Sequence, residues 1–550
     1  MPRPHDQAQS LYYDSPRYAS GPAPELVGGT GRHAVVIVGA GPVGLCAALT
    51  LAHHRVPSVV LDAKTSVGEG SRAICIARHS VEIFQQLGVA GRFLGKALPW
   101  TDGTSYYREQ PVYRLRMPHG PDERYYPMYN LQQQYIEQYL VEAAQATGLV
   151  DLRWGHALDT LRLADDMAVL EVDSPEGRYR LHAEHLVAAD GARSRVRHQL
   201  GLKLAGAAYE GRYVIVDVRM RSDYPTERRA FFDPVANRGA TVLVHKQPDD
   251  IWRIDYQLRD DEDEQDALAE REIRARVGAI VAMLGERAPW ELEWWSLYKA
   301  YTLCLDEYRH GPVLFAGDAA HLVPIFGVRG LNSGLADAAD LGWKLAMHVR
   351  GRAGPRLLDS YTPERRGATL DVFAQAGRST RFMTPPTRGE RLVRDAVLSL
   401  AAGHACARRL LDPRQSQPYS YAASPLTTAD DECSAFDDGP RPGMALANAR
   451  LDDGAFLLDG LGREFTLLAF GDAAPRDADR AALASAAEST GVDLEILHLP
   501  AGPPAASRCG VGAGGVLLVR PDRHVCARWR HLDVARVSEA LDRVLGRMPA

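Results

Sequence analysis

Residues 33–62 read HAVVIVGAGPVGLCAALTLAHHRVPSVVLD, and this stretch sets the architecture of the chain. Its first part, Ala34 to Val38, is a continuous run of apolar, mostly β-branched residues, which is typical of a strand buried on both faces. A glycine-rich turn, a predicted helix over 42–54 and a short strand over 58–61 follow. The order strand, turn, helix, strand predicts the β-α-β start of an α/β domain.

The glycine-rich turn carries the spacing GxGxxG at Gly39, Gly41 and Gly44. The first glycine permits a tight turn, the second lets backbone approach a pyrophosphate, and the third lets the helix pack on the strand. The helix N-terminus offers free N–H groups to phosphates, and Asp62 is placed to accept hydrogen bonds from an adenosine ribose. The pattern predicts dinucleotide binding without distinguishing FAD from NAD. The alternative is a glycine-rich turn without a ligand.

Two further acidic turns follow predicted strands. Asp190-Gly191 comes after 186–189 and precedes several arginines, so it could hold phosphates or ribose; alone, a turn with a charged helix start explains it better. Gly317-Asp318 comes after 313–316, where a carboxylate can accept hydrogen bonds from a ribityl chain. The alternative for Asp318 is a helix N-cap. His321 is expected to be structural rather than a general base.

Residues 324–334, PIFGVRGLNSG, form a glycine-rich approach to a helix predicted to begin at about Asn332. Its glycines let backbone lie close to a flat ring, and the helix N-terminus can face the pyrimidine end of a flavin and stabilise negative charge there. A glycine-rich loop before a helix, with no ligand, is the other interpretation.

The region from about 213 to 258 has a different periodicity. Apolar and polar residues alternate over 213–219 and 252–258, which predicts an antiparallel sheet domain inserted into the first domain. The acidic run 259–272 is expected to be a solvated loop and helix start. The polar and aromatic candidates for substrate contact are Tyr213, His245, Arg253 and Tyr256, although alternation does not say which face they share.

The length, net charge and cysteine content of the whole chain limit the possible classes of protein. Its 550 residues imply two to four domains, and a net charge of −6 gives no reason to expect nucleic acid or a membrane as partner. Seven scattered cysteines without a CxxC pair argue against a disulfide framework or zinc site, and no apolar run is long enough to span a bilayer. A cytoplasmic protein with a loosely ordered arm over 1–32 is expected.

The C-terminal part is expected to stand apart. Residues 411–443 are rich in Pro, Ser and Asp, which is typical of a linker. Beyond it, strand-like and helical stretches over 444–550 predict a small separate α/β domain. The expected order is therefore an arm (1–32), a dinucleotide-binding domain (33–205 and 306–410), an inserted sheet domain (206–305), a linker (411–443) and the C-terminal domain (444–550).

Taken together, the motifs resemble the single-component FAD-dependent aromatic hydroxylases with the p-hydroxybenzoate hydroxylase fold. The GxGxxG, Asp190-Gly191 and Gly317-Asp318 motifs occur in the family's order, joined by Gly70-Ser71-Arg72-Ala73, by Gln133 with Glu137 and Leu140, by GLNSGLADAADLGWKL ending at Leu345, and by Tyr361 with Glu364 and Arg365. The resemblance covers about residues 33–400. It is nearest to the branch with 3-(3-hydroxyphenyl)propionate and polyketide hydroxylases, whose C-terminal thioredoxin-like domain residues 444–548 resemble. Since Cys509 and Cys526 are too far apart in sequence for a redox pair, that domain is expected to serve packing or dimerisation.

The resemblance implies a glutathione-reductase-type FAD domain and a role for each matching residue. Asp62 would bind the adenosine ribose, Arg72 and Gln133 would contact FAD, and Asp190 would support both FAD and NAD(P)H. Asp318 would hold the ribityl chain, and Gly330, Leu331 and Asn332 would present backbone to the isoalloxazine. The family often has two prolines after the Gly-Asp motif. Here Pro324-Ile325 stands in that place, which alters the expected pocket shape.

The resemblance further implies a reaction. NADH or NADPH would reduce FAD, O2 would give the flavin C4a-hydroperoxide, and a hydroxyl would pass to a phenolic substrate. Since no second dinucleotide fingerprint is present, NAD(P)H is expected to bind transiently in a groove. Baeyer–Villiger oxidation or epoxidation on the same scaffold, and a non-catalytic FAD-binding or ligand-binding protein, are the alternatives. The substrate, the choice of NADH or NADPH and a homodimeric state are left open.

Overall fold

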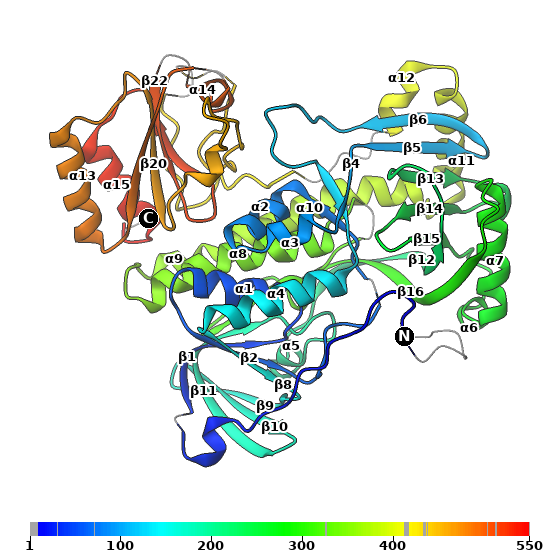
Figure 1. The fold of residues 1–550 in the computed structure, drawn as a ribbon, viewed down its shortest axis with the longest axis horizontal. Helices are drawn as coiled ribbons and strands as arrows, with labels where there is room; N and C mark the ends of the chain where they lie inside the picture. The colour runs from blue at the N-terminus through cyan, green and yellow to red at the C-terminus, as the bar shows by residue number, and fades with distance from the viewer. Residues whose placement is uncertain are drawn as a thin grey trace.

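The computed structural model describes residues 9–548, apart from residues 30, 71, 325–326, 412–416, 433–435, 437, 503 and 512–513. Figure 1 shows a parallel-stranded sheet with its helices in the lower half, an antiparallel sheet on the right and a smaller sheet unit at the upper left. Helices of the first region lie between the other two. The chain is therefore mixed α/β.

The first sheet contains the predicted β-α-β start, formed by β1, α1 and β2. Its central strands run parallel in the order β18-β11-β1-β2-β8, with β17 antiparallel to β18 and a β9-β10 hairpin added to β11. Val35, Val36 and Ile37 have no exposed surface, as the continuous apolar run predicts. The bounds are β1 (Arg32–Val38), β2 (Ser58–Asp62), β8 (Val150–Trp154), β9 (Ala157–Ala164), β10 (Met167–Ser174), β11 (Gly177–Ala188), β17 (Arg309–His310) and β18 (Val313–Phe315).

Two helices of this region cross at unusually short range. A Cβ on Gly334 would lie 2.6 Å from Val43, and a Cβ on Gly342 would lie 2.6 Å from Thr50, so only glycine allows α8 to approach α1 this closely. The helix α8 begins at Gly330, two residues before the predicted start. The helices are α1 (Pro42–His53), α2 (Arg78–Gln86), α3 (Ala90–Leu94), α4 (Gln133–Thr147), α5 (Arg195–Gln199), α8 (Gly330–Val349), α9 (Arg356–Asp359), α10 (Tyr361–Met383), α11 (Arg388–Ala401) and α12 (Ala405–Arg408).

The second sheet has the order β19-β16-β12-β15-β14-β13-β5-β6. It is larger than the inserted segment 206–305, because β5 (Asp102–Tyr107) pairs in parallel with β13 and brings β6 (Gln110–Arg116) with it. The expected boundary at 205 is thus wrong for these two strands. Remaining bounds are β12 (Ala205–Met220), β13 (Arg228–Phe232), β14 (Thr241–Lys246), β15 (Ile251–Gln257), β16 (Trp290–Cys304), β19 (His321–Leu322), α6 (Glu264–Ala267) and α7 (Glu270–Met283), and a small separate sheet holds β3 (Cys75–Ala77), β4 (Leu98–Trp100) and β7 (Met128–Asn130).

The alternation of this sheet separates a face covered by α7 from a face directed at the first region. Val214, Val216 and Tyr256 lie on the α7 side, in one buried cluster with Ile273 and Val277. Tyr256 is therefore a core residue, whereas Tyr213, His245 and Arg253 belong to the opposite face.

The N-terminal arm is not loosely ordered in the part that the structure describes. The Leu11 N–H donates to Glu293 of β16 at 2.7 Å, Tyr13 is buried, and Tyr18 stacks on Trp154 with ring centroids 4.6 Å apart. In Figure 1 the dark blue chain runs from the second sheet along the first. The aromatic side chains explain the order, because each buries a large apolar area against the body of the protein.

The C-terminal sheet has the order β21-β20-β22-β23, with β20 parallel to β21 and antiparallel to β22. It shares a core with the first region: Trp343 of α8 meets Phe465 edge to face at 6.2 Å. Part of the expected linker is also buried, since Tyr421 and Leu426 are 3% and 1% exposed. The elements are β20 (Phe465–Gly471), α13 (Asp477–Thr490), β21 (Leu494–Leu499), α14 (Ala505–Arg508), β22 (Gly514–Val519), β23 (Val525–Trp529) and α15 (Val534–Val544).

Candidate FAD and substrate site

The turn between β1 and α1 needs glycine at two positions for reasons internal to the protein. Gly39 has a φ of +107°, and a Cβ there would lie 2.4 Å from the Ala189 carbonyl oxygen. A Cβ on Gly44 would lie 1.9 Å from the Gly39 carbonyl oxygen. Both contacts are far inside van der Waals distance, so these glycines let the turn fold back on β11 and let α1 pack against it.

Gly41 has no such internal reason. Its φ of −76° suits any residue, and a Cβ built on it meets no described atom within 4 Å. It precedes the first turn of α1, where backbone N–H groups have no partner within the helix. Glycine at this position therefore leaves an open cradle at a helix N-terminus, of the kind that admits a phosphate group.

Asp62 lies beside this cradle at the end of β2. Its Oδ2 accepts from the Ala40 N–H at 2.8 Å and its Oδ1 from the Lys64 N–H at 2.9 Å. Each carboxylate oxygen has a second lone pair. The side chain is thus fixed by backbone and can still accept hydrogen bonds from sugar hydroxyls.

Asp318 lies in the short turn Gly317–Ala319 that follows β18. Its side chain is accessible to solvent, yet burial within the protein raises its pKa, against the opposing charges of His321, Arg72 and Arg197. Within the described part of the chain, the Asp318 carboxylate makes no hydrogen bond or ion pair, so its acceptors are free.

Asp190 is the second carboxylate with unused acceptors. Its Oδ2 accepts from the Val196 N–H at 3.0 Å, while its Oδ1 is buried without a partner among the described residues. Burial raises its pKa. A buried acceptor of this kind is costly unless a ligand or water completes it.

The segment 68–73 approaches from another direction. The Ala73 N–H donates to Gln133 Oε1 at 3.1 Å, and Gln133 Nε2 donates to Glu137 at 2.7 Å. The Gly68 N–H donates to the same Glu137. Gln133 therefore holds the segment that carries the exposed Arg72, and its free lone pair is what it can offer a ligand.

The N-terminus of α8 is anchored by Asn332. Its side chain accepts from the Ala77 N–H at 2.9 Å and from Ser80 at 2.7 Å, and it donates to the Cys75 and Val328 carbonyls. The side chain is fully used, so Asn332 can offer only backbone to a ligand, as can Gly330 and Leu331. Val328, a β-branched residue with a φ of +59°, is a strained position in this approach. Ile325 of the expected Pro324-Ile325 departure lies outside the described residues, as does Ser71.

Asp337 is a buried carboxylate that holds several groups in place, and no sequence motif identified it. It accepts from the Gly317 N–H at 3.0 Å, from His321 at 2.7 Å and from Arg365 at 2.7 Å. Burial opposes its ionisation, but the charges of His321 and Arg365 outweigh that effect and lower the pKa of Asp337 to about 2. It thereby fixes the turn that presents Asp318. His321 has the structural place expected for it.

A row of polar side chains crosses the second sheet on the face toward this site. Trp294, Asp217, Arg253 and His245 are successive cross-strand partners, and Arg253 pairs with Asp217 at 2.8 Å. Arg253 also donates to the Arg72 carbonyl at 3.1 Å. The row therefore meets the segment that carries Arg72.

The same face holds three groups whose pKa values are shifted by burial. Burial lowers the pKa of Arg228, which makes no hydrogen bond or ion pair to the residues described. Its side chain is half-buried. Burial also raises the pKa of Asp255 to about 7, although Arg253 opposes the shift. Its Oδ1 lies 3.9 Å from Arg253 Nε and accepts no hydrogen bond in the described structure. Burial and nearby arginines, Arg228 first, lower the pKa of His245 to about 3, so that its ring is neutral.

Comparison with known proteins connects this geometry to a family. The family described as FAD binding domain matches residues 32–376. This chain belongs to that family. The match includes the Gly39–Gly44 turn, both acidic turns and the start of α8, so the resemblance drawn from the sequence is confirmed.

Individual relatives agree with it. A 3-(3-hydroxy-phenyl)propionate/3-hydroxycinnamic acid hydroxylase of Mycolicibacterium smegmatis is 29% identical over 450 residues, which cover 79% of this chain and 76% of that protein. The FAD-dependent monooxygenase apdD of Emericella nidulans is 27% identical over 565 residues, covering 93% and 89%. A crystal structure of the flavin-dependent monooxygenase PieE with FAD and substrate superposes with a TM-score of 0.74, at 25% identity, over 94% of this chain and 99% of that one.

The residues present fit FAD. Gly41 leaves space where a phosphate would lie, Asp62 has acceptors for a ribose, and Asp318 and Asp190 have carboxylate oxygens without protein partners among the described residues. The described residues contain no cluster of His, Cys, Asp and Glu suited to a metal ion. No helix in the described part of the chain is long and apolar enough to cross a membrane.

Proposed function

We propose that this chain is an FAD-dependent monooxygenase that uses NAD(P)H and O2 to hydroxylate a phenolic substrate. The observation that carries the proposal is the junction at Arg72, where the proposed FAD site and the polar row of the second sheet meet through the Arg253–Arg72 hydrogen bond of 3.1 Å. The names of the relatives support it, because they are hydroxylases and monooxygenases.

The proposed contacts to FAD use the hydrogen-bonding groups and open backbone positions described above. Gly39, Gly41 and Gly44 shape the pyrophosphate turn, Asp62 binds the adenosine ribose, and Asp318 binds the ribityl chain. Arg72 and Gln133 act from the 68–73 segment, Asp190 supports FAD and NAD(P)H, and the backbone of Gly330, Leu331 and Asn332 faces the isoalloxazine. When bound, FAD supplies the redox and oxygen-transfer chemistry, which no side chain can supply.

The substrate is proposed to lie against the polar face of the second sheet. Arg228 is a half-buried cation without an ion pair to the described residues, so it favours a phenolate or a carboxylate beside it. Asp255 has a pKa of about 7, which suits a group that accepts a phenolic proton near neutral pH. A phenol that loses its proton becomes richer in electron density and reacts more readily with an electrophilic oxygen.

The proposal also covers the C-terminal unit, the location of the protein, NAD(P)H binding and the assembly. The C-terminal unit has the strand order and directions of a thioredoxin-like fold, which supports that assignment and its domain boundary at about 444. Cys509 and Cys526 are both buried and free, which fits a redox-inert unit and a cytoplasmic location. NADH or NADPH is proposed to bind transiently, and a homodimer is the proposed assembly.

The test begins with the visible spectrum of the purified protein. NADH and NADPH oxidation is then followed in air with neutral phenols and with phenols that carry a carboxylate. Flavin absorbance, faster oxidation with one phenol and a product heavier by one oxygen are expected. Ring expansion or an epoxide would support the alternative oxidations. Protein that cannot be reconstituted with FAD, or flavin that stays oxidised under every condition, would contradict the proposal.

The role of Asp255 gives a sharper prediction. Because only the ionised carboxylate accepts a proton, kcat/KM should rise with pH through an apparent pKa near 7. Asp255→Asn should lower kcat about 100-fold and remove that rise. Asp250→Asn, at an exposed turn of the same sheet, is the matched control and should behave as the wild type. An unchanged pH profile in Asp255→Asn would assign the proton transfer elsewhere.

A further inference from the structure

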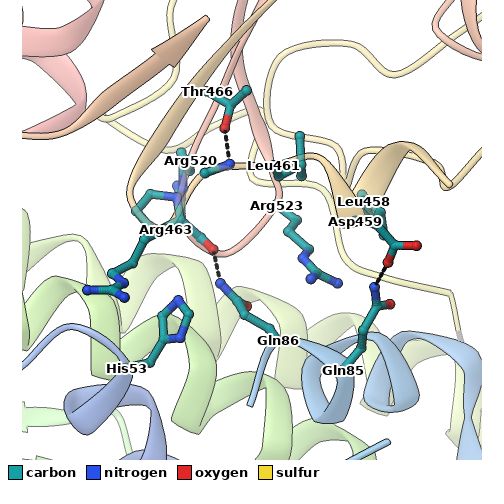
Figure 2. A pocket seen from close by; sticks show the side chains of 12 residues that line it. His53, Gln85, Gln86, Leu458, Asp459, Leu461, Arg463, Thr466, Arg520 and Arg523 are labelled. Carbon is teal, nitrogen blue, oxygen red and sulfur yellow. Dashed lines mark hydrogen bonds between the residues drawn. The ribbon is translucent and has the colours of Figure 1, made fainter. Parts of the chain in front are cut away.

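A second cavity lies away from the FAD site, between the C-terminal sheet unit and the first region. It encloses about 330 Å³ and is lined by His53 of α1, by Gln85 and Gln86 of α2, and by segments around Arg463 and Arg523 (Figure 2). His53 is in the last turn of α1, whereas Gly41 precedes the first. Since a 12-residue helix is about 18 Å long, the cavity is distinct from the pyrophosphate turn.

The positive charge in this cavity is not compensated. Arg463 is exposed and makes no hydrogen bond or ion pair to any described residue. Arg523 donates from one Nη to the Glu82 carbonyl at 2.8 Å and has no ion pair with a carboxylate in the described structure. Arg520, by contrast, forms ion pairs with Asp340, Glu364 and Asp522. Arg463 and Arg523 are therefore the arginines of the cavity that no described carboxylate neutralises.

The carboxylate that lines the cavity already has partners in the described structure. Asp459 is the carboxylate among the described lining residues, and it pairs with Arg124 and accepts from Gln85. Figure 2 shows Asp459 turned toward Gln85, while Arg463 and Arg523 extend toward α1 and α2. Among the described lining residues, Arg463 and Arg523 thus have no ion pair, whereas Asp459 has one.

A buried imidazole adds a third polar group. His53 Nε2 is buried and lacks a hydrogen-bond partner in the part of the chain that the structure describes. Burial, and then the charges of Arg463 and Arg523, lower the pKa of His53 to about 4. The other titratable ring beside it is His54, with centroids 5.1 Å apart. Both arginines and His53 line the same cavity.

Helix capping explains only part of this arrangement. Arg523 binds a carbonyl near the end of α2, as cations often do at a helix C-terminus. That role uses one N–H group and accounts neither for Arg463 nor for the unpaired His53 Nε2. A ligand that accepts hydrogen bonds and carries negative charge accounts for all three.

We propose that this cavity binds a small molecule through a phosphate group. Two uncompensated guanidinium groups match the double negative charge of a phosphate, and the planar donor edge of arginine fits its oxygens. The neutral imidazole of His53 adds one N–H donor. The cavity volume is within the range of small-molecule sites and exceeds that of the phosphate group alone, so the rest of the ligand also fits.

The test uses full-length protein saturated with FAD, so that the pyrophosphate turn is filled. Inorganic phosphate is titrated calorimetrically at constant ionic strength, with acetate as the carboxylate probe. One saturable phosphate site is expected, at least tenfold weaker in Arg463→Gln and in Arg523→Gln. Arg480→Gln, an exposed arginine of α13, is the control and should bind as the wild type.

The imidazole gives an independent readout. His53→Gln keeps an N–H donor and should bind phosphate within about threefold of the wild type, whereas His53→Leu should lose at least fivefold. The absence of saturable binding, equal affinity in Arg463→Gln, or acetate binding as tight as phosphate would each overturn the proposal. Because Arg463 is exposed, its substitution should leave the thermal midpoint unchanged, and this can be measured on the same samples.

Discussion

At the scale of single residues, the Gly39–Gly44 turn separates what the fold needs from what a ligand needs. A Cβ on Gly44 would lie 1.9 Å from the Gly39 carbonyl oxygen, while Gly41 faces open space. The motif predicts these two roles, for Gly41 as a binding position and for Gly44 as a packing position. Their surroundings in the folded chain differ accordingly.

This difference predicts opposite outcomes for two alanine substitutions. Gly41→Ala should leave the free energy of unfolding of the FAD-free protein within about 0.5 kcal/mol, because its backbone suits alanine. It should weaken FAD binding at least tenfold, because the methyl group enters the phosphate cradle. Gly44→Ala should destabilise the FAD-free protein by about 2 kcal/mol or more through overpacking.

Flavin content per chain and thermal unfolding of the FAD-free protein measure both effects. If Gly41→Ala retained FAD as the wild type does, the pyrophosphate would not lie against this turn. If Gly44→Ala unfolded at the wild-type temperature, the close packing of α1 on the turn would be incorrect.

At the scale of elements, α8 joins the pieces of the site. Its first turn is tied to β3 and α2 by Asn332, and its second turn holds the Gly317-Asp318 turn through Asp337. The close approach to α1 depends on Gly334 and Gly342. One helix thereby positions both acidic and backbone groups of the proposed FAD site.

Asp337→Asn should therefore lower the free energy of unfolding of the protein as well as weaken its own hydrogen bonds. Removing one partner from a buried charged cluster typically costs about 3–5 kcal/mol. Since the folded pKa is near 2 and the ordinary value is 3.8, the stabilisation is fully present above pH 4 and is lost as the pH falls toward 2. The gap in thermal midpoint between wild type and variant should narrow over that range.

Asp359→Asn provides the control, because Asp359 forms a 2.6 Å ion pair at the surface, where its side chain is 65% exposed. It should shift the midpoint little at any pH. A midpoint for Asp337→Asn that stays near that of the control at pH 7 would show that the cluster does not stabilise the turn.

At the scale of the whole molecule, the C-terminal unit is joined to the first region by buried charge as well as by a shared core. Arg520 pairs with Glu364 at 2.8 Å and with Asp340 at 3.0 Å, and Lys344 pairs with the same two carboxylates. Trp343 lies against the Arg520 guanidinium at 5.2 Å. The N-terminal arm joins the other two regions in a comparable way through Leu11 and Tyr18.

Arg520→Met is predicted to uncouple the C-terminal unit. It removes one cationic partner from the buried carboxylates Asp340, Glu364 and Asp522, at a cost of about 3–5 kcal/mol. Differential scanning calorimetry should show a lower midpoint or a separate early transition. Arg274→Met, which removes an exposed i,i+4 pair in α7, should cost about 0.5 kcal/mol or less. Equal thermograms for the two variants would contradict a role for the network in coupling the units.

Local sequence patterns were sufficient to predict part of the elements and the order of the motifs. Continuous apolar runs, period-two alternation and glycine spacing act over a few residues, so β1, α1, β2, the inserted sheet and the C-terminal strands were predictable. The placement of Asp62, Asp190 and Asp318 at strand ends followed from the same local rules. These features depend on backbone geometry and side-chain periodicity, which neighbouring residues set.

Long-range packing determines the remaining features, and these could be learned only from the folded chain. It joins β5 and β6 to the second sheet, orders the N-terminal arm, buries part of the linker and sets the face that carries Arg228, His245 and Asp255. It also makes Asp337 and Arg520 buried charges. Burial, pKa and cavity shape depend on contacts between residues hundreds of positions apart, and no local pattern encodes them.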